Sequence, residues 1–386
     1  MIGHSPFWHA NLGASRVLAR PGDWRLWLIN AGAACLWDWR QAGLQGAALA
    51  EHLTQAYGLD LAESRRQVGA ILRQWRQIGL IGACRPPDPL EAAWGLPTAE
   101  PSTAWPAQTL SLRLAGHAMG LWVEDPLLRQ SLAPWLAAAT LPPSHTGGSG
   151  PLFKLRGKSA HWRLEAPGQT LETGQGVDAA LLAVLRELTE SACRAAERLL
   201  VVHGAGLVGP DGAGVLLIAP GGSGKTTLAT ALNAKGLPLL HDDVVPVTLD
   251  GDLLGLGLPI TLKSGSWPIL QTLRPDLGET PIRHRLGQPV RLLPPRGPVP
   301  SGPVPLGALV FPRYLPGAPA HVQRLTPEAA LQGLIEAEAV IRQLTQDKLE
   351  RLARWIESAP AWSLTYPDLA SGLDGMRRIL GQPIGA

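Results

Sequence analysis

The sequence has few cysteines, no long hydrophobic run and little net charge, and each absence excludes a class of protein. Its three cysteines, Cys35, Cys84 and Cys193, lie far apart without a C-x-x-C spacing, so they indicate isolated thiols rather than a disulfide framework or metal site. No run of about 18 uninterrupted apolar residues predicts a membrane span, and the opening MIGHSPFWHA lacks the basic and apolar regions of a secretion signal. The formal net charge of +3 does not by itself indicate nucleic-acid binding. We therefore expect a cytoplasmic protein that does not insert in a membrane.

The length and composition predict more than one domain. The 386 residues exceed a typical single domain, and 45% hydrophobic residues with a mean hydropathy of +0.06 allow a large core. Residues 1–85 form one unit by pattern. Residues 86–106 are rich in proline, alanine and polar residues with no sustained period, as expected for a linker. We expect a second unit over residues 107–386.

A glycine-rich loop follows a short apolar run in LLIAPGGSGKTTLATAL, residues 216–232. Residues 215–218 predict a buried strand, and residues 225–235, closed by Gly236, predict a helix whose positive end faces the loop. Glycines let the loop turn its N–H groups inward around an anion. Lysine would reach the β and γ phosphates of a nucleotide, and the first threonine would hold Mg²⁺. The predicted phosphate cradle is Gly221, Gly222, Ser223, Gly224, Lys225, Thr226 and Thr227, with Ala219 in place of the usual first glycine.

Two adjacent acids follow the next predicted strand. Leu239 and Leu240 enter that strand and Asp242 and Asp243 emerge from it. One carboxylate can hold the metal and the other can accept the proton of an attacking hydroxyl. The alternative is a turn or a helix cap. His203 ends the first strand of a predicted hairpin that turns at residues 210–212 and leads into the loop; its alternative is a satisfied core histidine.

The N-terminal unit has a winged-helix pattern. Residues 24–30 predict a strand, residues 31–40 and 47–57 predict short helices, and a longer helix follows in which apolar residues recur at helical spacing. Four arginines occupy the other positions of this helix: Arg65, Arg66, Arg73 and Arg76.

Residues 10–85 resemble a PqqD-like domain, the type that recognises leader peptides of ribosomally made, modified peptides. The resemblance lies in LINAGAACLWDWRQAGLQGAALAEHL and VGAILRQWRQIGLI. It implies that a leader adds as an extra strand and lies against the third helix, whose arginines meet acidic leader residues. Two alternatives stay open. With nine arginines, no lysine and five acids in residues 1–85, the basic helix could enter a DNA groove, or the arginines could form a solvated face.

Residues 199–263 resemble the catalytic domain of HPr kinase/phosphorylase and its relatives in lasso-peptide clusters. The resemblance lies in VVHGAGLV, APGGSGKTTLATAL and LLHDDVVPV, and a looser similarity covers most of residues 107–386. It implies an α/β P-loop kinase domain that transfers the γ-phosphoryl group of ATP to a serine. Carried over by motif, Asp242 would contact the metal, Asp243 would be the base and His203 would tune its charge. Lys263 and Arg313 are candidate phosphate or substrate contacts.

One departure from that family concerns the substrate. No counterpart of its Arg-Gly-Ile signature follows the acids, which puts HPr itself, and the reverse dephosphorylation, in doubt. Our first hypothesis is an ATP- and Mg²⁺-dependent kinase acting on a serine or threonine of a precursor peptide, delivered by its leader. The alternatives are a DNA-binding regulator with an ATP switch, and a nucleotide-dependent peptide carrier. A homo-oligomer is possible, and nucleic acid is a less favoured partner.

Overall fold

The computed structural model describes residues 7–21, 25–82, 105–142, 150–194 and 197–381. The chain divides into two compact units, one of residues 1–96 with 343–357 and the other of residues 97–342 with 358–386. Most of the predicted linker, and Cys84, lie outside the described residues. Each unit mixes helices and sheet, so the molecule is of mixed α/β class. None of the helices in the described ranges is long and apolar enough to cross a membrane.

The first unit pairs a small sheet with three helices, and the strand and helices that the sequence predicts are confirmed. Asn30 caps the first helix and Asp60 caps the third with their side-chain oxygens. The core is aromatic, with the rings of Trp37 and Trp75 packed edge to face at 5.5 Å. The first two strands were not predicted. The antiparallel sheet has the order β1 (Trp8–Leu12), β2 (Ser15–Ala19), β3 (Leu26–Ile29), followed by α1 (Ala31–Gln41), α2 (Ala47–Tyr57) and α3 (Leu61–Gln77).

A helix from far along the chain completes this unit. In α10 (Gln346–Ser358), the amide of Gln346 accepts a hydrogen bond from the backbone N–H of His9 at 3.1 Å and donates one to its carbonyl at 2.8 Å. The N–H of Gly13 also donates to Glu357 at 2.6 Å. Side chains of α10 thus satisfy backbone groups at the outer edge of the β1–β2 hairpin. The second predicted domain is therefore not continuous, because residues 343–357 belong with the first unit.

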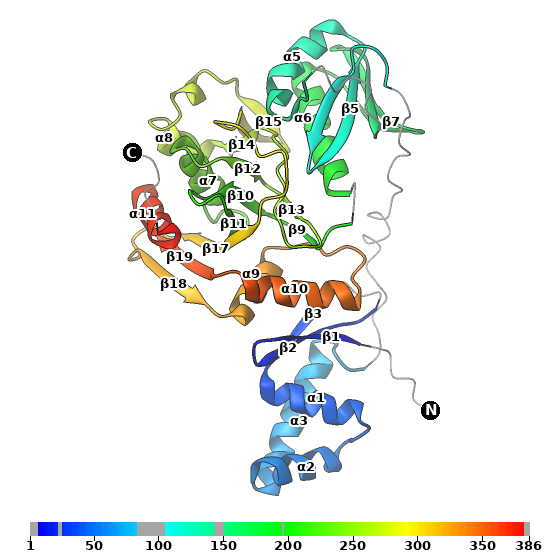
Figure 1. Ribbon diagram of the computed structural model, residues 1–386, viewed down its shortest axis with the longest axis vertical. Coiled ribbons are helices and arrows are strands. Elements are labelled where there is room, and N and C mark those ends of the chain that lie inside the picture. Colours follow the sequence, from blue (N-terminus) through cyan, green and yellow to red (C-terminus); the bar gives the residue numbers. More distant parts are fainter. Residues whose placement is uncertain (1–6, 22–24, 83–104, 143–149, 195–196, 382–386) are drawn as a thin grey trace. The chain divides into compact units, whose positions relative to one another are not determined.

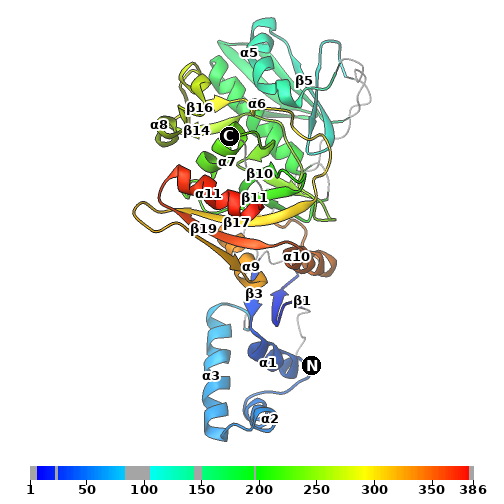
Figure 2. The ribbon, with the colours of Figure 1, turned by 60° about the vertical axis from the view of Figure 1, so that its left-hand side comes forward.

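The second unit contains a six-stranded sheet with helices on both faces (Figures 1 and 2). Residues of α7 and α11 share one hydrophobic core on one face of the sheet. Helix α9 contacts the last two strands in the sheet order given below, β19 and β18. The predicted hairpin into the glycine-rich loop is present, with Gly204 opposite Ile218 and Val208 opposite Gly214. The sheet order is β12 (Leu239–Asp242), β10 (Gly204–Val208), β11 (Gly214–Ile218), β17 (Leu306–Tyr314), β19 (Ala361–Tyr366) and β18 (His321–Leu325); the helices are α7 (Lys225–Ala234), α9 (Pro327–Glu336) and α11 (Leu369–Leu380).

The strands and helices between residues 107 and 198 form a second layer of this unit around a second core, to which Leu254, Leu256, Leu258 and Leu292 also contribute. Its five-stranded sheet has the order β4 (Leu110–Leu114), β5 (His117–Val123), β6 (Leu152–Lys158), β7 (His161–Ala166), β8 (Gln169–Gly174), with α5 (Pro126–Leu136) and α6 (Val177–Arg194).

Smaller elements complete the second unit. The prolines of residues 289–307 predict a mobile or extended loop, but residues 289–293 belong to a strand, because Val290 and Leu292 are buried and the segment pairs with a neighbouring strand. These elements are the sheet β14 (Ile260–Lys263), β16 (Gln288–Leu293), β15 (Arg283–Arg285), the pair β9 (Leu200–Val202) and β13 (Val245–Val247), and α8 (Trp267–Leu270).

Candidate functional site

The sheet topology brings three sequence motifs to one edge of the sheet, the edge at which β11 and β12 end. β10 is antiparallel to both β11 and β12, so the start of β10 lies at the same edge as the ends of β11 and β12. His203, which separates β9 from β10, therefore meets the loop after β11 and the acids after β12. The sequence places His203 at the end of one strand; in the structure it stands between two strands with different partners. Ligands of open α/β sheets bind at such an edge.

The glycine-rich loop has free space beside its first glycines and is closely packed beside its last. Gly222 and Gly224 have φ angles of +83° and +89°, which favour glycine. A Cβ atom added at Gly221 or Gly222 would meet no atom within 4 Å. A Cβ atom at Gly224 would lie 2.5 Å from the hydroxyl of Tyr366, so this glycine is required by packing. The buried hydroxyl of Ser223 has no hydrogen-bond partner among the described residues.

Lys225 points back into the loop that precedes it. Its ammonium group donates to the carbonyl of Ala219 at 2.5 Å and to that of Pro220 at 3.4 Å. Burial lowers the pKa of Lys225, while the charges of Asp242 and Asp243 oppose that shift. The ammonium group is thus held over the loop, between the backbone and the two acids, in a position to contact an anion bound by the loop.

Asp242 is buried against the start of α7. The side chain of Thr226 lies close enough to its carboxyl group to favour the charged form, and one carboxyl oxygen, Oδ1, is buried without a partner among the described residues. Burial, followed by the charge of Asp243, raises the pKa of Asp242 to about 7. A buried carboxyl with an unsatisfied oxygen beside a threonine hydroxyl has the donor set of a Mg²⁺ site, which uses one or two carboxylates and otherwise water and phosphate. Within the described ranges, no three His, Cys, Asp or Glu side chains could hold a metal by themselves.

Asp243 leaves the strand in an unusual backbone conformation and is half exposed. Its φ angle is +94°, in a region that residues other than glycine rarely adopt and that is found at functional sites. Its Oδ1 lies 3.6 Å from Nδ1 of His203, and its Oδ2 lies 3.5 Å from a guanidinium nitrogen of Arg285. Burial and the charge of Lys225 lower the pKa of His203, so the imidazole is neutral at pH 7. Arg285 is therefore the charged partner of this carboxylate.

Both acids line a pocket of about 210 Å³ between α6 and the strand ends. Its lining includes the apolar side chains of Leu182, Leu185 and Leu258, and the charged side chains of Arg186, Glu190 and Arg285. Arg285 was missed in the sequence. A signal existed, because it sits in β15 just before a two-residue turn, Leu286 and Gly287, that returns the strand. Only the pairing of β15 with β16 places it beside Asp243.

The other predicted site residues are not all at this edge. Lys263 ends β14, and its positive charge adds slightly to the lowering of the pKa values of His203 and Lys225 that burial mainly causes, so it lies on the same side of the sheet as these two residues. The hydroxyl of Thr227 hydrogen-bonds to Ser266 at 2.8 Å, away from the cradle. Arg313 is exposed on β17 and alternates with Tyr314, which faces the loop, so Arg313 lies on the opposite face of the strand.

The four arginines of α3 are all exposed. At 100° per residue they fall within about 100° of arc, apart from the buried side of the helix. Arg66 forms an ion pair with Glu63 in the first turn. The others, Arg65, Arg73 and Arg76, leave a basic stripe along one side of α3.

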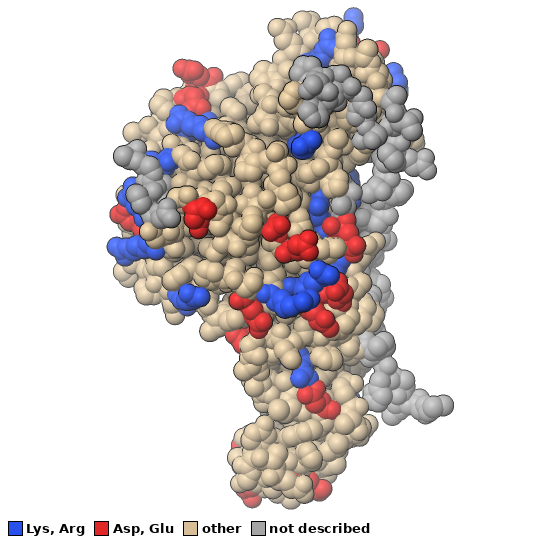
Figure 3. All heavy atoms as spheres, viewed as in Figure 1, with Lys and Arg blue, Asp and Glu red and all other residues tan. Residues whose placement is uncertain are grey.

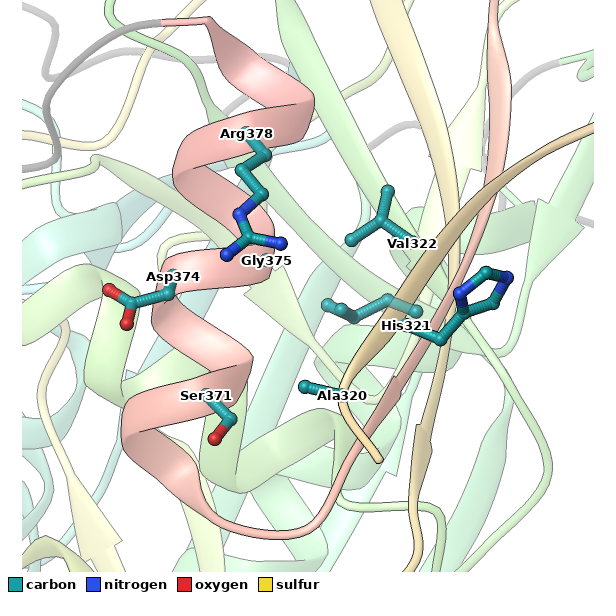
Figure 4. A pocket seen from close by; sticks show the side chains of 8 residues that line it. Ala320, His321, Val322, Ser371, Asp374, Gly375 and Arg378 are labelled. Carbon is teal, nitrogen blue, oxygen red and sulfur yellow. The ribbon is translucent and has the colours of Figure 1, made fainter. Parts of the chain in front are cut away.

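A smaller hollow of about 90 Å³ lies between α11 and β18 (Figure 4). The close-up shows Asp374 and His321 directed away from the space between helix and strand. Gly375, whose missing side chain makes room there, and Val322 face it. Its polar groups do not converge, in contrast to those around Asp243.

No protein-family model and no curated protein matches the sequence. Its function is therefore inferred from the arrangement of its own residues.

Proposed function

We propose that the chain is an ATP-dependent kinase of a peptide hydroxyl, with residues 219–227 as its P-loop. The observation that carries the proposal is the position of the acid pair. Both acids line the 210 Å³ pocket, and the buried Asp242 also lies beside Thr226 at the start of α7. Asp242 would thus connect the place where phosphates would lie with the pocket, and the half-exposed Asp243 would meet an acceptor that enters it.

The cradle would bind the phosphates through its backbone N–H groups, the helix start and Lys225. Nucleotide binding would draw the lysine ammonium from the carbonyls of Ala219 and Pro220 toward the β and γ phosphates. Thr226 and Asp242 would hold Mg²⁺, which supplies positive charge to neutralise the phosphate oxygens. Binding of that charge would favour ionised Asp242.

The acceptor hydroxyl would lie in the pocket within hydrogen-bonding reach of Asp243. As the hydroxyl oxygen bonds to the γ-phosphorus, its proton passes to Asp243 and the bond from the γ-phosphorus to the β–γ bridging oxygen breaks. The electron pair of that bond leaves with ADP. Arg285 and His203 would hold the Asp243 carboxylate toward the acceptor. The apolar pocket wall would exclude water, which otherwise competes as acceptor.

The first unit would recognise the leader of a precursor peptide. Among the described residues, β3 pairs only with β2, so its outer edge offers unpaired backbone groups to an added strand. At the opposite edge of the sheet, the side chain of Gln346 in α10 forms hydrogen bonds with the backbone N–H and carbonyl of His9. The winged-helix order and the basic stripe of α3 fit a leader with acidic residues.

The basic stripe also supports a second candidate, a DNA-binding regulator with an ATP switch. On the face of the molecule in Figure 3, basic and acidic side chains intermingle over α10, without a large patch of one sign. The exposed arginines of α3 form one narrow stripe, which is small for a DNA-binding face. DNA binding whose affinity falls steeply with salt, without phosphoryl transfer, would favour this candidate.

The test of the proposed activity is transfer of labelled γ-phosphate from ATP to a peptide encoded beside the gene for this chain. We expect transfer by the wild type, and a loss of about 10²–10⁴-fold for Asp243→Asn with nucleotide affinity retained, as for removal of a general base. Asp242→Asn should raise the Mg²⁺ concentration that transfer requires, and it should also weaken nucleotide binding. Nucleotide binding without transfer to any peptide would favour the carrier or the regulator.

A further inference from the structure

Two tyrosines pack against the glycine-rich loop on the side away from the acids. The N–H of Tyr314, at the end of β17, donates to the carbonyl of Ser223 at 3.0 Å. The hydroxyl of Tyr366, at the end of β19, donates to the carbonyl of Gly224 at 3.4 Å. The two rings lie 5.8 Å apart at an interplanar angle of 48°. Strand β17 lies next to β11, on the opposite side from β10 and β12, and β19 lies next to β17.

The two tyrosines differ in exposure. Tyr366 is buried, and burial raises the pKa of its phenol above the ordinary value. Tyr314 is 42% exposed, and the next residue, Leu315, is 40% exposed. The backbone contact to Ser223 and the ring contact to Tyr366 fix the position of Tyr314, while much of its surface stays open to solvent. A fixed, exposed aromatic ring beside an anion cradle suits a ligand that has both a planar ring and phosphates.

The direction of a bound nucleotide follows from the sheet order. Lys225 and Thr226 lie toward Asp242, so the γ-phosphate end would lie on the β12 side. The α-phosphate and the nucleoside must then extend the other way, across the end of β11 toward β17 and β19. That direction leads to the exposed ring of Tyr314.

We infer that Tyr314 is the nucleobase platform of this site, with the base of the nucleoside triphosphate stacked on its exposed face beside Leu315. This inference rests on the proposed function, since it requires the loop to bind a nucleotide. It assigns a role to a residue that no sequence motif marks. The contribution is stacking alone, so it depends on the aromatic ring and not on the phenol hydroxyl.

Binding of two ligands, ATP and inorganic tripolyphosphate, tests the platform by calorimetry on the full chain with Mg²⁺. Both carry the phosphates, and only ATP carries a base. For the wild type, we expect ATP to bind about 10-fold or more tightly than tripolyphosphate, the scale of one stacked base. Tyr314→Ala should lose that difference and leave tripolyphosphate affinity unchanged, because alanine keeps the backbone N–H to Ser223. Tyr314→Phe should retain it.

The matched control is Tyr57→Ala, which removes an exposed tyrosine from the first unit. It should leave both affinities as in the wild type. Equal loss of both ligands in Tyr314→Ala would indicate a structural role for the ring and overturn the inference. Unchanged ATP affinity in that variant would also overturn it while leaving the proposed kinase intact. Failure of both ligands to bind the wild-type chain would overturn the proposed function itself, and the platform with it.

Discussion

Nδ1 of His203 lies 3.6 Å from Oδ1 of Asp243. The two residues are forty positions apart in the chain and meet because β10 starts at the edge where β12 ends. Since the lowered pKa of His203 keeps the imidazole neutral at pH 7, the pair is not an ion pair there. The other oxygen of Asp243 is left to Arg285 at 3.5 Å, which makes that arginine the charged group beside the carboxylate.

Arg285→Gln should lower kcat for peptide phosphorylation about 10-fold or more and leave ATP affinity unchanged, because the carboxylate loses its charged partner. Arg285→Lys should restore part of the rate, since the positive charge returns without the guanidinium geometry. The control is His284→Gln, an exposed neighbour on the same short strand. A loss of ATP affinity equal to the loss of rate would place Arg285 in nucleotide binding instead.

The pH dependence of stability should reveal two buried groups with opposite effects. The pKa of Asp242 is raised to about 7, so the folded state holds a proton that the unfolded state releases, and stability falls as pH rises from about 4 to 7. Burial lowers the pKa of His241 to about 4, so stability rises as pH increases from 4 to 6.5. The two slopes oppose each other between pH 4 and 6.5.

Asp242→Asn should therefore uncover the effect of His241. In urea unfolding with EDTA and no nucleotide, its stability should rise between pH 4.5 and 6.5 by about 1–3 kcal/mol, the scale of a shift of one to two pKa units. At pH 8 this variant should be more stable than the wild type. Lower stability of Asp242→Asn at pH 8 would contradict the burial of an unsatisfied carboxylate.

Gly224→Ala should destabilise the second unit. The new Cβ atom would meet the hydroxyl of Tyr366 at 2.5 Å and the Cβ atom of Tyr314 at 3.0 Å, at a φ angle of +89°. We expect a loss of about 2 kcal/mol or more in the free energy of unfolding, from backbone strain and displaced rings. Gly221→Ala is the matched control, because its Cβ atom meets nothing within 4 Å. Equal stability of the two variants would mean that the loop packs differently.

Arg73→Glu with Arg76→Glu should weaken binding of a precursor peptide that has an acidic leader. Fluorescence anisotropy of the labelled leader should show at least a 10-fold rise in Kd at low salt, and a smaller effect at high salt because the charges are screened. Arg354→Glu reverses an exposed arginine of α10 and should leave leader affinity unchanged. If the double variant loses affinity for duplex DNA and not for the leader, the regulator is favoured.

Local patterns predict most elements near the site, and pairing between distant segments explains what they miss. Apolar runs, the turn at residues 210–212 and the Gly-Lys-Thr motif are short-range signals, and the hairpin, the loop and α7 follow them. The turn at Leu286 and Gly287 is a local signal for the strand that carries Arg285, but it does not indicate that this strand lies beside Asp243. Tyr314 carries no local signal, since its strand pairs with β19, about fifty residues further along the chain. α10 is amphipathic in sequence, but its sequence does not reveal that it completes the N-terminal unit.

Leader-dependent phosphorylation is the decisive test of the proposed kinase. A precursor peptide encoded beside the gene would be incubated with ATP, Mg²⁺ and the wild-type chain or Asp243→Asn, and its intact mass measured with and without the leader. We expect a gain of one phosphate, about 80 Da for the group, only with the leader present and the wild-type aspartate in place. A gain that is equal for the leaderless peptide, or that persists in Asp243→Asn, would contradict it.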